Sequence, residues 1–372
     1  MKALILTMTC GNGHNAMANN CKKGFEAKGV EAKVYNIYES NRFEQKLFDK
    51  SYVWSCEHIP HLYNKIWNSQ RNRDPNKRYH GGVQYSIARI TKPLLNIINE
   101  YQPDIILCTH NYASAIINNL IIKKSIAKCL TATILFDFVI HPYWENSIEL
   151  DYIITPYQDV EEELIYKGFK PSQIKPLGLP TNPIFEEKLD KKECRKKLSL
   201  DLDKFTALAV SGGNGLGIIN LVKSLSKSQR DFQLICICGN NAKMKAKVDK
   251  YCAKHNLTNI YTYGFVNNIQ EFLYASDCVF CRGGSGTISE SVHTDLPIIF
   301  REGIITNEIA NARLIEKRGA AIILNNVEDA PKVLEYIIDN PAYAKKMIEN
   351  SKYFIKNNVV SSIVDFLISE VK

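Results

Sequence analysis

The sequence predicts an α/β protein with two doubly wound, mostly parallel sheets. Short apolar runs alternate with helical stretches over most of the 372 residues, which implies right-handed crossovers between parallel strands. The apolar runs are continuous rather than alternating, as in strands that helices cover on both faces. Typical domains hold about 100–200 residues, so this length favours two of them.

Eleven apolar runs are expected to form the strands, five before a Pro- and Gly-rich segment and six after it. They span 3–8, 32–37, 104–109, 131–136, 152–155, 206–210, 233–238, 259–263, 277–281, 297–300 and 320–324. The Pro- and Gly-rich segment at 177–183 and the charged stretch at 186–197 indicate a hinge. We therefore expect an N-terminal domain over 1–183, a linker over 184–203, a C-terminal domain over 204–345, and a last helix over 346–372 that packs back on the first domain.

The 11 cysteines are odd in number and lie mostly in apolar runs, which favours buried thiols in a reducing cytosol. Cys278 and Cys281 have the spacing of metal ligands, but i,i+3 residues of a strand point to opposite faces. No second pair or nearby histidine completes a site, so no metal is expected. No signal peptide or apolar stretch of about 20 residues is evident, so work on a lipid would proceed from the membrane surface.

The net charge of +8 is unevenly distributed. Residues 65–92 hold seven Lys or Arg residues against a single acidic residue, Asp74, with aromatic residues interleaved. Such a stretch suits an anionic membrane surface, although nucleic-acid-binding patches and plain solvated loops have similar compositions. The candidate membrane-contact residues are Trp67, Arg71, Arg73, Lys77 and Arg78.

The loop TCGNGHNA at 9–16 follows the first expected strand and opens a helix. Its glycines, Gly11 and Gly13, allow a tight turn, and the helix N-terminus favours an anion or a polarised oxygen. His14 lies at the carboxyl edge of the strand, where ligands of open α/β sheets bind, and can accept a proton from an attacking hydroxyl. The alternative is a histidine that only caps the loop. A dinucleotide site is disfavoured because the third glycine is missing and Asn36 replaces the acidic ribose ligand.

The loop RGGSGTISE at 282–290 follows the expected strand at 277–281. Exposed amides, hydroxyl donors and the positive end of a helix together predict a diphosphate cradle. Glu290 is expected in the first turn of the helix, where it accepts hydrogen bonds from ribose hydroxyls or simply favours the helix dipole. The candidate cradle residues are Arg282, Gly284, Ser285, Gly286 and Thr287.

Three further polar loops follow expected strands. SGGNGLG at 211–217 has four glycines, and because each costs chain entropy we expect a second phosphate-facing or interdomain loop. DFVIHPYW at 137–144 indicates a cleft edge, or a packed loop with a buried tryptophan. TNEIAN at 306–311 offers groups for sugar hydroxyls, or is a polar helix start. The candidates in these loops are Gly213, Asn214, Asp137, His141, Trp144, Asn307 and Glu308.

In this order the motifs resemble the monogalactosyldiacylglycerol synthase and processive diacylglycerol glucosyltransferase family, which is related to the peptidoglycan-precursor N-acetylglucosaminyltransferase. QIKPLGLP at 173–180, YGFV at 263–266 and DLPII at 295–299 extend the resemblance over nearly the whole chain. The resemblance implies a GT-B fold, two Rossmann-like domains facing a central cleft. It also implies a UDP-sugar donor on the C-terminal domain, a lipid acceptor on the N-terminal domain, inversion at the anomeric carbon, and no cofactor or obligatory metal.

The resemblance also implies individual roles. His14 would be the base that deprotonates diacylglycerol, Gly13 beside it would contact the donor, and Glu290 would bind ribose. Phe265 and Val266 would approach the uracil, and Glu308 with Asn307 would bind the sugar. Three residues depart from the family pattern: Asn307 stands for glutamine, Ser285 for proline and Asn12 for a glycine.

The expected activity is transfer of glucose or galactose from UDP-glucose or UDP-galactose to diacylglycerol. The enzyme is expected to be cytoplasmic and peripheral on the anionic inner face of the cell membrane, without nucleic acid as a partner. Such transfer requires His14 to face the loop at 283–287 across the cleft. The alternatives are a UDP-sugar 2-epimerase, a non-catalytic UDP-sugar sensor, and a transferase with a polyprenyl-linked or small-molecule acceptor. The residues predict no particular oligomeric state.

Overall fold

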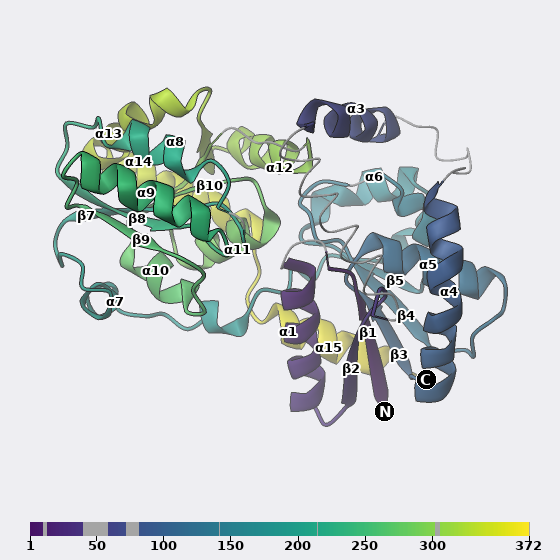
Figure 1. Ribbon diagram of the computed structural model, residues 1–372. Helices are drawn as coiled ribbons and strands as arrows, with labels where there is room; N and C mark the ends of the chain where they lie inside the picture. The colour runs from purple at the N-terminus through teal and green to yellow at the C-terminus, as the bar shows by residue number, and fades with distance from the viewer. Residues whose placement is uncertain are drawn as a thin grey trace. The chain divides into compact units, whose positions relative to one another are not determined.

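The computed structural model describes residues 1–9, 13–39, 59–71, 82–140, 142–213, 215–301 and 306–371. The chain forms two compact units, which Figure 1 colours from purple at the N-terminus to yellow at the C-terminus. The first unit comprises Met1–Pro183 together with Lys356–Lys372, and the second comprises Ile184–Ile355. The chain therefore passes from one unit to the other twice.

The first unit is a parallel six-stranded sheet with helices in the connections. Its elements are β1 (Lys2–Thr7), α1 (Gly13–Ala27), β2 (Glu31–Asn36), α3 (Pro60–Arg71), α4 (Gly82–Tyr101), β3 (Ile105–Cys108), α5 (Asn111–Ile122), β4 (Leu130–Ile134), η1 (Trp144–Ser147), β5 (Tyr152–Ile154), η2 (Gln158–Val160), α6 (Glu161–Tyr166), η3 (Pro171–Gln173), β6 (Ile174–Lys175) and α15 (Val359–Glu370). The strand order is β2-β1-β3-β4-β5-β6.

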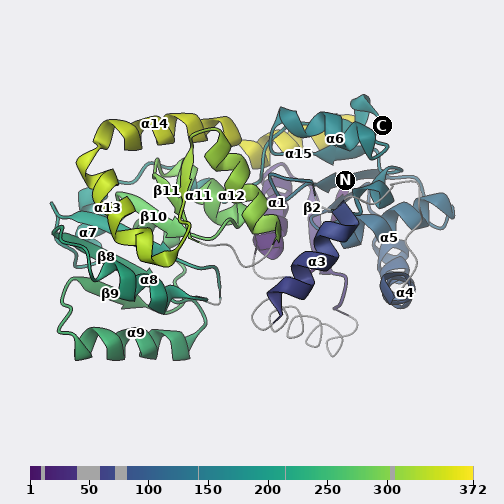
Figure 2. The same cartoon turned by 90° about the horizontal axis from the view of Figure 1, so that it is seen from above.

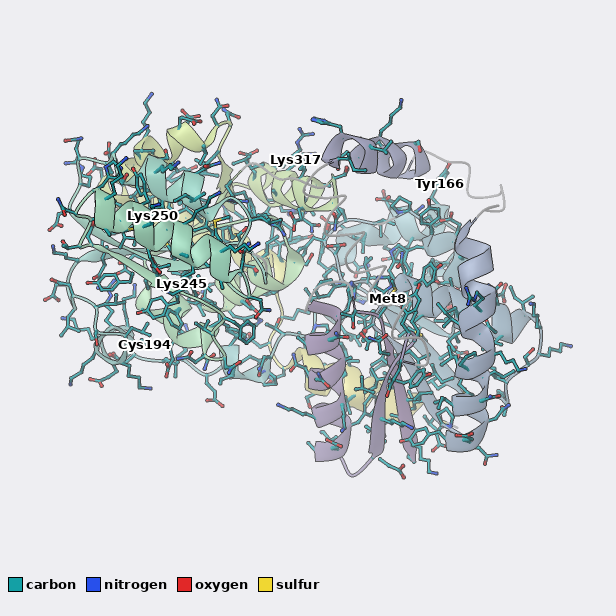
Figure 3. All side chains as sticks on the ribbon, viewed as in Figure 1. Met8, Tyr166, Cys194, Lys245, Lys250 and Lys317 are labelled. Atoms are coloured by element: carbon teal, nitrogen blue, oxygen red, sulfur yellow. The ribbon has the colours of Figure 1, made fainter. Side chains whose placement is uncertain are left out.

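Both faces of β1 are covered, which explains its unbroken apolar sequence. Leu4 and Leu6 pack in a core cluster with residues of α4 and α5. Helix α1 buries an apolar stripe at helical spacing that includes Met17, Cys21 and Phe25. Figure 3 labels Met8, which lies just past the carboxyl end of β1 and is 1% exposed.

The C-terminal helix α15 packs against α1, and Figures 1 and 2 show it within the first unit. The two helices meet closely at Gly24, where a Cβ atom would lie 2.6 Å from Cγ1 of Val360. Lys28 pairs with Asp365 at 2.7 Å on the surface of this contact. A side chain larger than hydrogen at position 24 would push the helices apart, so this residue fixes how closely α15 approaches.

The second unit repeats the plan. Its elements are η4 (Pro183–Phe185) at the boundary, α7 (Lys191–Lys197), β7 (Phe205–Val210), α8 (Ile218–Leu225), β8 (Phe232–Ile237), α9 (Ala242–Lys254), β9 (Ile260–Tyr263), α10 (Ile269–Ala275), β10 (Cys278–Cys281), α11 (Ser285–His293), β11 (Ile298–Phe300), α12 (Thr306–Lys317), β12 (Ala321–Ile323), η5 (Val327–Asp329), α13 (Ala330–Asp339), α14 (Pro341–Ser351) and η6 (Lys352–Phe354). The parallel order is β12-β11-β10-β7-β8-β9.

Helices α8, α9 and α13 bury their apolar residues in one core cluster with strands β7, β8 and β10. In Figure 1, α10 lies on the other side of this sheet. Helix α9 turns Val248 inward with 0% exposure, whereas Lys245 and Lys250, labelled in Figure 3, lie on its outer side. The amphipathic pattern of the helix thus follows from one buried stripe and one solvated face.

Two predicted boundaries differ from the structure. The expected linker at 184–203 is folded into the second unit, because Arg195 of α7 is 4% exposed and donates to the carbonyl oxygens of Ala275 and Leu202 at 2.9 and 2.8 Å. The expected last helix at 346–372 is divided, since α14 and η6 belong to the second unit and only α15 belongs to the first. Strand β6 has only two residues, directly before Pro176, and has no counterpart among the expected strands.

Asp277 holds the buried Arg195 guanidinium at 2.5 Å and also accepts a hydrogen bond from the Thr206 amide at 2.8 Å. Replacing Asp277 with alanine is expected to lower the free energy of unfolding by about 3 kcal/mol, because a buried charge loses its partner. Chemical denaturation measures this loss. The control is Lys192→Ala, which breaks an exposed pair with Asp203 and should change stability by less than about 1 kcal/mol. Equal effects of the two substitutions would contradict the prediction.

Within the described ranges, no helix is both long enough and apolar enough to cross a bilayer. The described cysteines carry free thiols, and burial raises the pKa values of Cys278 and Cys281 well above the ordinary range. Among the same residues, no three His, Cys, Asp or Glu side chains are grouped to hold a metal ion.

Candidate functional site

In the first unit the strand order reverses between β1 and β3, because the chain adds β2 on one side of β1 and later strands on the other. Helices that follow the two central strands therefore diverge, and the carboxyl ends of β1 and β3 border a crevice where ligands of such sheets bind. The residues after β1 lead into α1, and those after β3 lead into α5. This edge is the candidate site of the first unit.

His14 stands in the first turn of α1 at this edge and is half-buried. Its Nδ1 lies 2.5 Å from the carbonyl oxygen of Thr109, just after β3. A carbonyl can only accept, so Nδ1 carries the proton and Nε2 is the nitrogen that can accept one. This orientation suits a general base.

Phe136, which follows β4, packs on the His14 ring with centroids 4.6 Å apart. The same ring explains Gly13, because a Cβ atom there would lie 2.6 Å from Cζ of Phe136. Asp137 is the next residue and is half-buried, so the structure brings it to the neighbourhood of His14.

A small polar network anchors the loop before α1. Asn36, at the end of β2, donates to the Thr9 hydroxyl at 2.5 Å, and Asn15 donates to the same oxygen at 3.1 Å. Thr7 in turn donates to Asn15 at 3.1 Å. Asn36 thus fixes the turn into α1, a role that an acidic ribose ligand would not have.

Two residues at this edge, Thr109 and His110, are not among the candidates from the sequence. His110 follows β3 and Thr109, and its ring stands edge-to-face on the His14 ring with centroids 4.5 Å apart. The available signal is the one that marks His14, a histidine directly after a buried strand and before a helix. The structure adds Thr109 and His110 to the candidate site.

In the second unit the strand order reverses between β7 and β10. The loop after β7 is the glycine-rich segment at 211–217, and the loop after β10 runs into α11. Both loops therefore lie at the switch point of this sheet, where the first helix turns offer backbone amides to an anion.

Arg282 directly follows β10 and pairs with Glu308 of α12, Nη2 to Oε1, at 3.1 Å. Gly283 packs so closely on α12 that a Cβ atom there would collide with the Glu308 carbonyl oxygen. The phosphate-cradle loop and the predicted sugar-binding residues are thereby one rigid assembly. Asn311 completes it, donating to the Gly283 carbonyl at 3.0 Å and to the Ser285 hydroxyl at 3.1 Å.

Two glycines of the 211–217 loop are required by packing within the second unit, whereas the sequence suggested a phosphate-facing or interdomain loop. Gly215 has a φ of 57°, and a Cβ atom there would collide with the Cys238 carbonyl oxygen. Gly217 has a φ of 72° and rests on the buried Arg301 guanidinium, which leaves no room for a Cβ atom. The loop after β7 therefore packs with its backbone against the backbone of the loop after β8 and against Arg301, which follows β11.

Glu290 lies in the second turn of α11 rather than the first, because the helix begins at Ser285. Its side chain is partly covered, and burial raises the pKa of the carboxyl to about 7. The helix-dipole explanation weakens with distance from the first turn. A carboxylate kept in an unfavourable environment near a ligand-binding loop is typical of a functional group.

At the carboxyl end of β9, Phe265 is 55% exposed and Val266 is half-buried. An exposed aromatic face next to a phosphate-binding edge suits stacking or edge contact with a nucleobase.

Comparison with known proteins shows which sequences this chain resembles. The family model of monogalactosyldiacylglycerol synthase matches residues 14–181, and that of the glycosyltransferase family 28 C-terminal domain matches residues 209–364. A processive diacylglycerol beta-glucosyltransferase of Bacillus licheniformis is 28% identical over 99% of this chain and 94% of its own length. Along its length the chain is similar to monogalactosyldiacylglycerol synthases and processive diacylglycerol glucosyltransferases.

A second relative and a structural neighbour extend the comparison. A probable chloroplastic monogalactosyldiacylglycerol synthase of Glycine max is 28% identical over 98% of this chain and 70% of its own length. The crystal structure of Acinetobacter baumannii MurG has a TM-score of 0.68 and 14% identity, and the match covers 99% of both chains. The chain therefore has the GT-B architecture of two Rossmann-like units.

The structure places one candidate residue, Trp144, differently from the prediction. Trp144 is predicted at a cleft edge, but it is 3% exposed at the start of η1, which packs on α5. The residue before it, Tyr143, has a φ of 81°, and this left-handed backbone conformation directs the Trp144 side chain toward the core. Trp144 is therefore a core residue of the first unit, which is the alternative that the sequence left open.

The remaining candidates differ in how far the structure describes them. Gly213, Gly284, Gly286, Thr287 and Asn307 are half-buried at the switch point or at the start of α12. The backbone of Trp67 and Arg71 belongs to α3, and their side chains lie outside the described part. His141, Asn214, Arg73, Lys77 and Arg78 lie outside the described residues.

Proposed function

We propose that the protein transfers a hexose from a UDP-sugar to the hydroxyl of diacylglycerol, with inversion at the anomeric carbon. The observation that carries the proposal is the orientation of His14, whose Nδ1 is bound to Thr109 so that Nε2 can accept a proton. The full-length similarity to a processive diacylglycerol beta-glucosyltransferase supports the substrate pair.

In the proposed reaction, the acceptor hydroxyl attacks the anomeric carbon while its proton passes to Nε2 of His14. The bond from the anomeric carbon to the β-phosphate oxygen breaks, and its electron pair leaves with UDP. Attack opposite the leaving group inverts the configuration, which turns an α-linked donor into a β-glycoside. The first unit thus supplies the base and the second supplies the donor site.

The second unit stabilises the departing diphosphate through the amides at the start of α11 and through Arg282. Arg282 is also bound to Glu308, so the charge on the phosphate side is coupled to the residues proposed for the sugar, Glu308 and Asn307. Glu290 accepts hydrogen bonds from the ribose, and Phe265 with Val266 contacts the base. Because these groups supply the positive charge themselves, we propose that no metal ion is obligatory.

We further propose that the protein works on an anionic membrane surface as a peripheral protein of the cytoplasmic leaflet. The support is the basic and aromatic stretch at 65–92, together with exposed apolar side chains that directly precede it in the sequence. Leu62 of α3 is 52% exposed and Ile59, just before the helix, is 37% exposed. Exposed apolar side chains next to cationic ones are typical of interfacial helices.

The test is a matrix of donors against acceptors. UDP-glucose, UDP-galactose and UDP-N-acetylglucosamine are each incubated with diacylglycerol or a polyprenyl diphosphate lipid, with and without anionic vesicles and EDTA. We expect hexosyl-diacylglycerol from UDP-glucose or UDP-galactose, more of it on anionic vesicles, and less than a twofold change with EDTA. Conversion of a UDP-sugar without any acceptor would instead indicate an epimerase. Transfer only to the polyprenyl lipid would refute the proposed acceptor.

A further inference from the structure

His110 is held in place more firmly than a surface histidine requires. Its carbonyl oxygen accepts hydrogen bonds from both the amide and the hydroxyl of Ser114, each at 3.1 Å. Ser114 is fully buried and its hydroxyl is also 2.6 Å from that of Thr133. The backbone of His110 is therefore tied to the core of the first unit through α5 and β4.

The ring of His110 is fixed as well. It is the N-cap of α5, and its Nδ1 accepts a hydrogen bond from the Tyr112 amide at 3.1 Å. A nitrogen that accepts carries no proton, so the proton of the neutral ring is on Nε2. Protonation of Nδ1 would break the cap and place a positive charge at the positive end of the helix. The cap thus makes His110 a hydrogen-bond donor through Nε2.

The neighbouring His14 has the opposite arrangement, with its proton on Nδ1 and its acceptor at Nε2. The two rings are in contact at a centroid distance of 4.5 Å and both are partly exposed at the switch point. A hydroxyl that donates to Nε2 of His14 therefore binds a ring that His110 contacts. Nε2 of His14 accepts a proton and Nε2 of His110 donates a hydrogen bond. This pair suits an acceptor molecule that carries the reacting hydroxyl on one carbon and a second oxygen on the adjacent carbon.

We propose that His110 positions the acceptor by donating a hydrogen bond from Nε2 to the acceptor oxygen on the carbon next to the reacting hydroxyl. In diacylglycerol this is the oxygen of the central ester group. The inference rests on the proposed function, since it assumes a glyceryl acceptor. It assigns His110 to acceptor binding, with no part in proton transfer and none in donor binding.

The test uses His110→Asn, because the Asn side-chain oxygen can replace Nδ1 as the cap whereas its amide is too short to reach the place of Nε2. We expect kcat/KM for diacylglycerol to fall about 10–100-fold, with KM for the UDP-sugar and the melting temperature unchanged. His110→Ser, which also keeps a capping oxygen, should show the same loss. His110→Ala should add a lower melting temperature through loss of the cap.

A second acceptor separates positioning from general damage. This acceptor is a two-chain analogue of diacylglycerol in which a methylene group replaces the central ester oxygen, the one on the carbon next to the reacting hydroxyl. The wild-type enzyme should use this analogue about 10–100-fold less efficiently, and His110→Asn should use both acceptors equally.

Unchanged kinetics of His110→Asn with diacylglycerol would overturn the inference. So would an equal penalty for the analogue in both enzymes, or a loss that appears in KM for the donor. If the wild-type enzyme transfers no hexose to diacylglycerol in this assay, the proposed function itself fails, and that outcome is distinct because it precedes any variant.

Discussion

Replacing His14 with alanine is expected to lower the rate of hexose transfer by roughly 10²–10⁴-fold while UDP binding is retained. The hydrogen bond from Nδ1 to Thr109 fixes the ring so that Nε2 is the accepting nitrogen, and the methyl group of alanine cannot accept a proton. The donor-site residues belong to the second unit, so removing an imidazole from the first should leave UDP affinity within about twofold of wild type.

The measurement is kcat from hexosyl-diacylglycerol formation, together with the Kd of UDP from calorimetry. The matched control is His255→Ala, because His255 is an exposed histidine at the end of α9 and should leave both quantities unchanged. Near-normal turnover of His14→Ala would remove this residue from the mechanism. Loss of UDP binding together with turnover would indicate misfolding, and the melting temperature separates that case.

Replacing Glu290 with glutamine is expected to weaken UDP-glucose binding about 10–100-fold, the value of one or two hydrogen bonds to a charged group. Glutamine keeps the size of the side chain and removes only the negative charge. The Kd for UDP-glucose, measured without acceptor, gives the effect. An unchanged Kd would contradict the role of Glu290 in holding the ribose.

The raised pKa of Glu290 adds a pH dependence to this prediction. Burial raises the pKa from an ordinary 4.5 to about 7, so the free protein holds the carboxyl largely protonated below pH 7. Ribose hydroxyls bind the charged form, so affinity for UDP-glucose should rise as the pH increases through 7. The sugar nucleotide has no ionisation in this range, and the pH dependence should disappear in Glu290→Gln.

The same shift has an effect of opposite sign on stability. The folded state binds this proton more tightly than the unfolded state, so the free energy of unfolding falls as the pH rises between about 4.5 and 7. Glu290→Gln should therefore be more stable than wild type above pH 7, by about 3 kcal/mol, and equally stable near pH 4.5. Melting curves at the two pH values measure both cases.

Continuous apolar runs were sufficient to predict most of the fold. Each expected strand corresponds to a strand of the structure, and the loops singled out after 3–8 and 277–281 lie at the two switch points. Strand β6 escaped detection because a strand of two residues carries no periodic signal. The linker was misjudged because the charges of α7 suggested solvent, whereas Arg195 is buried with Asp277.

The candidate sites were predicted less completely, for reasons that concern packing. His14 and Glu290 could be found because each lies shortly after a glycine-containing loop that follows a strand. Trp144 also comes after a strand but is turned into the core, and the backbone geometry of Tyr143 reveals this. His110 was missed because no glycine precedes it, since its ring and carbonyl are fixed by side chains instead.

The return of the chain to the first unit has a consequence for biosynthesis. The face of α1 that receives Val360 is completed by residues that leave the ribosome after the whole second unit. The second unit is one continuous segment of the chain, Ile184–Ile355, so it can fold before the final helix of the first unit has been synthesised. Premature termination near position 355 would thus leave the second unit complete. The first unit would lack α15, and the apolar face of α1 that this helix covers would be exposed.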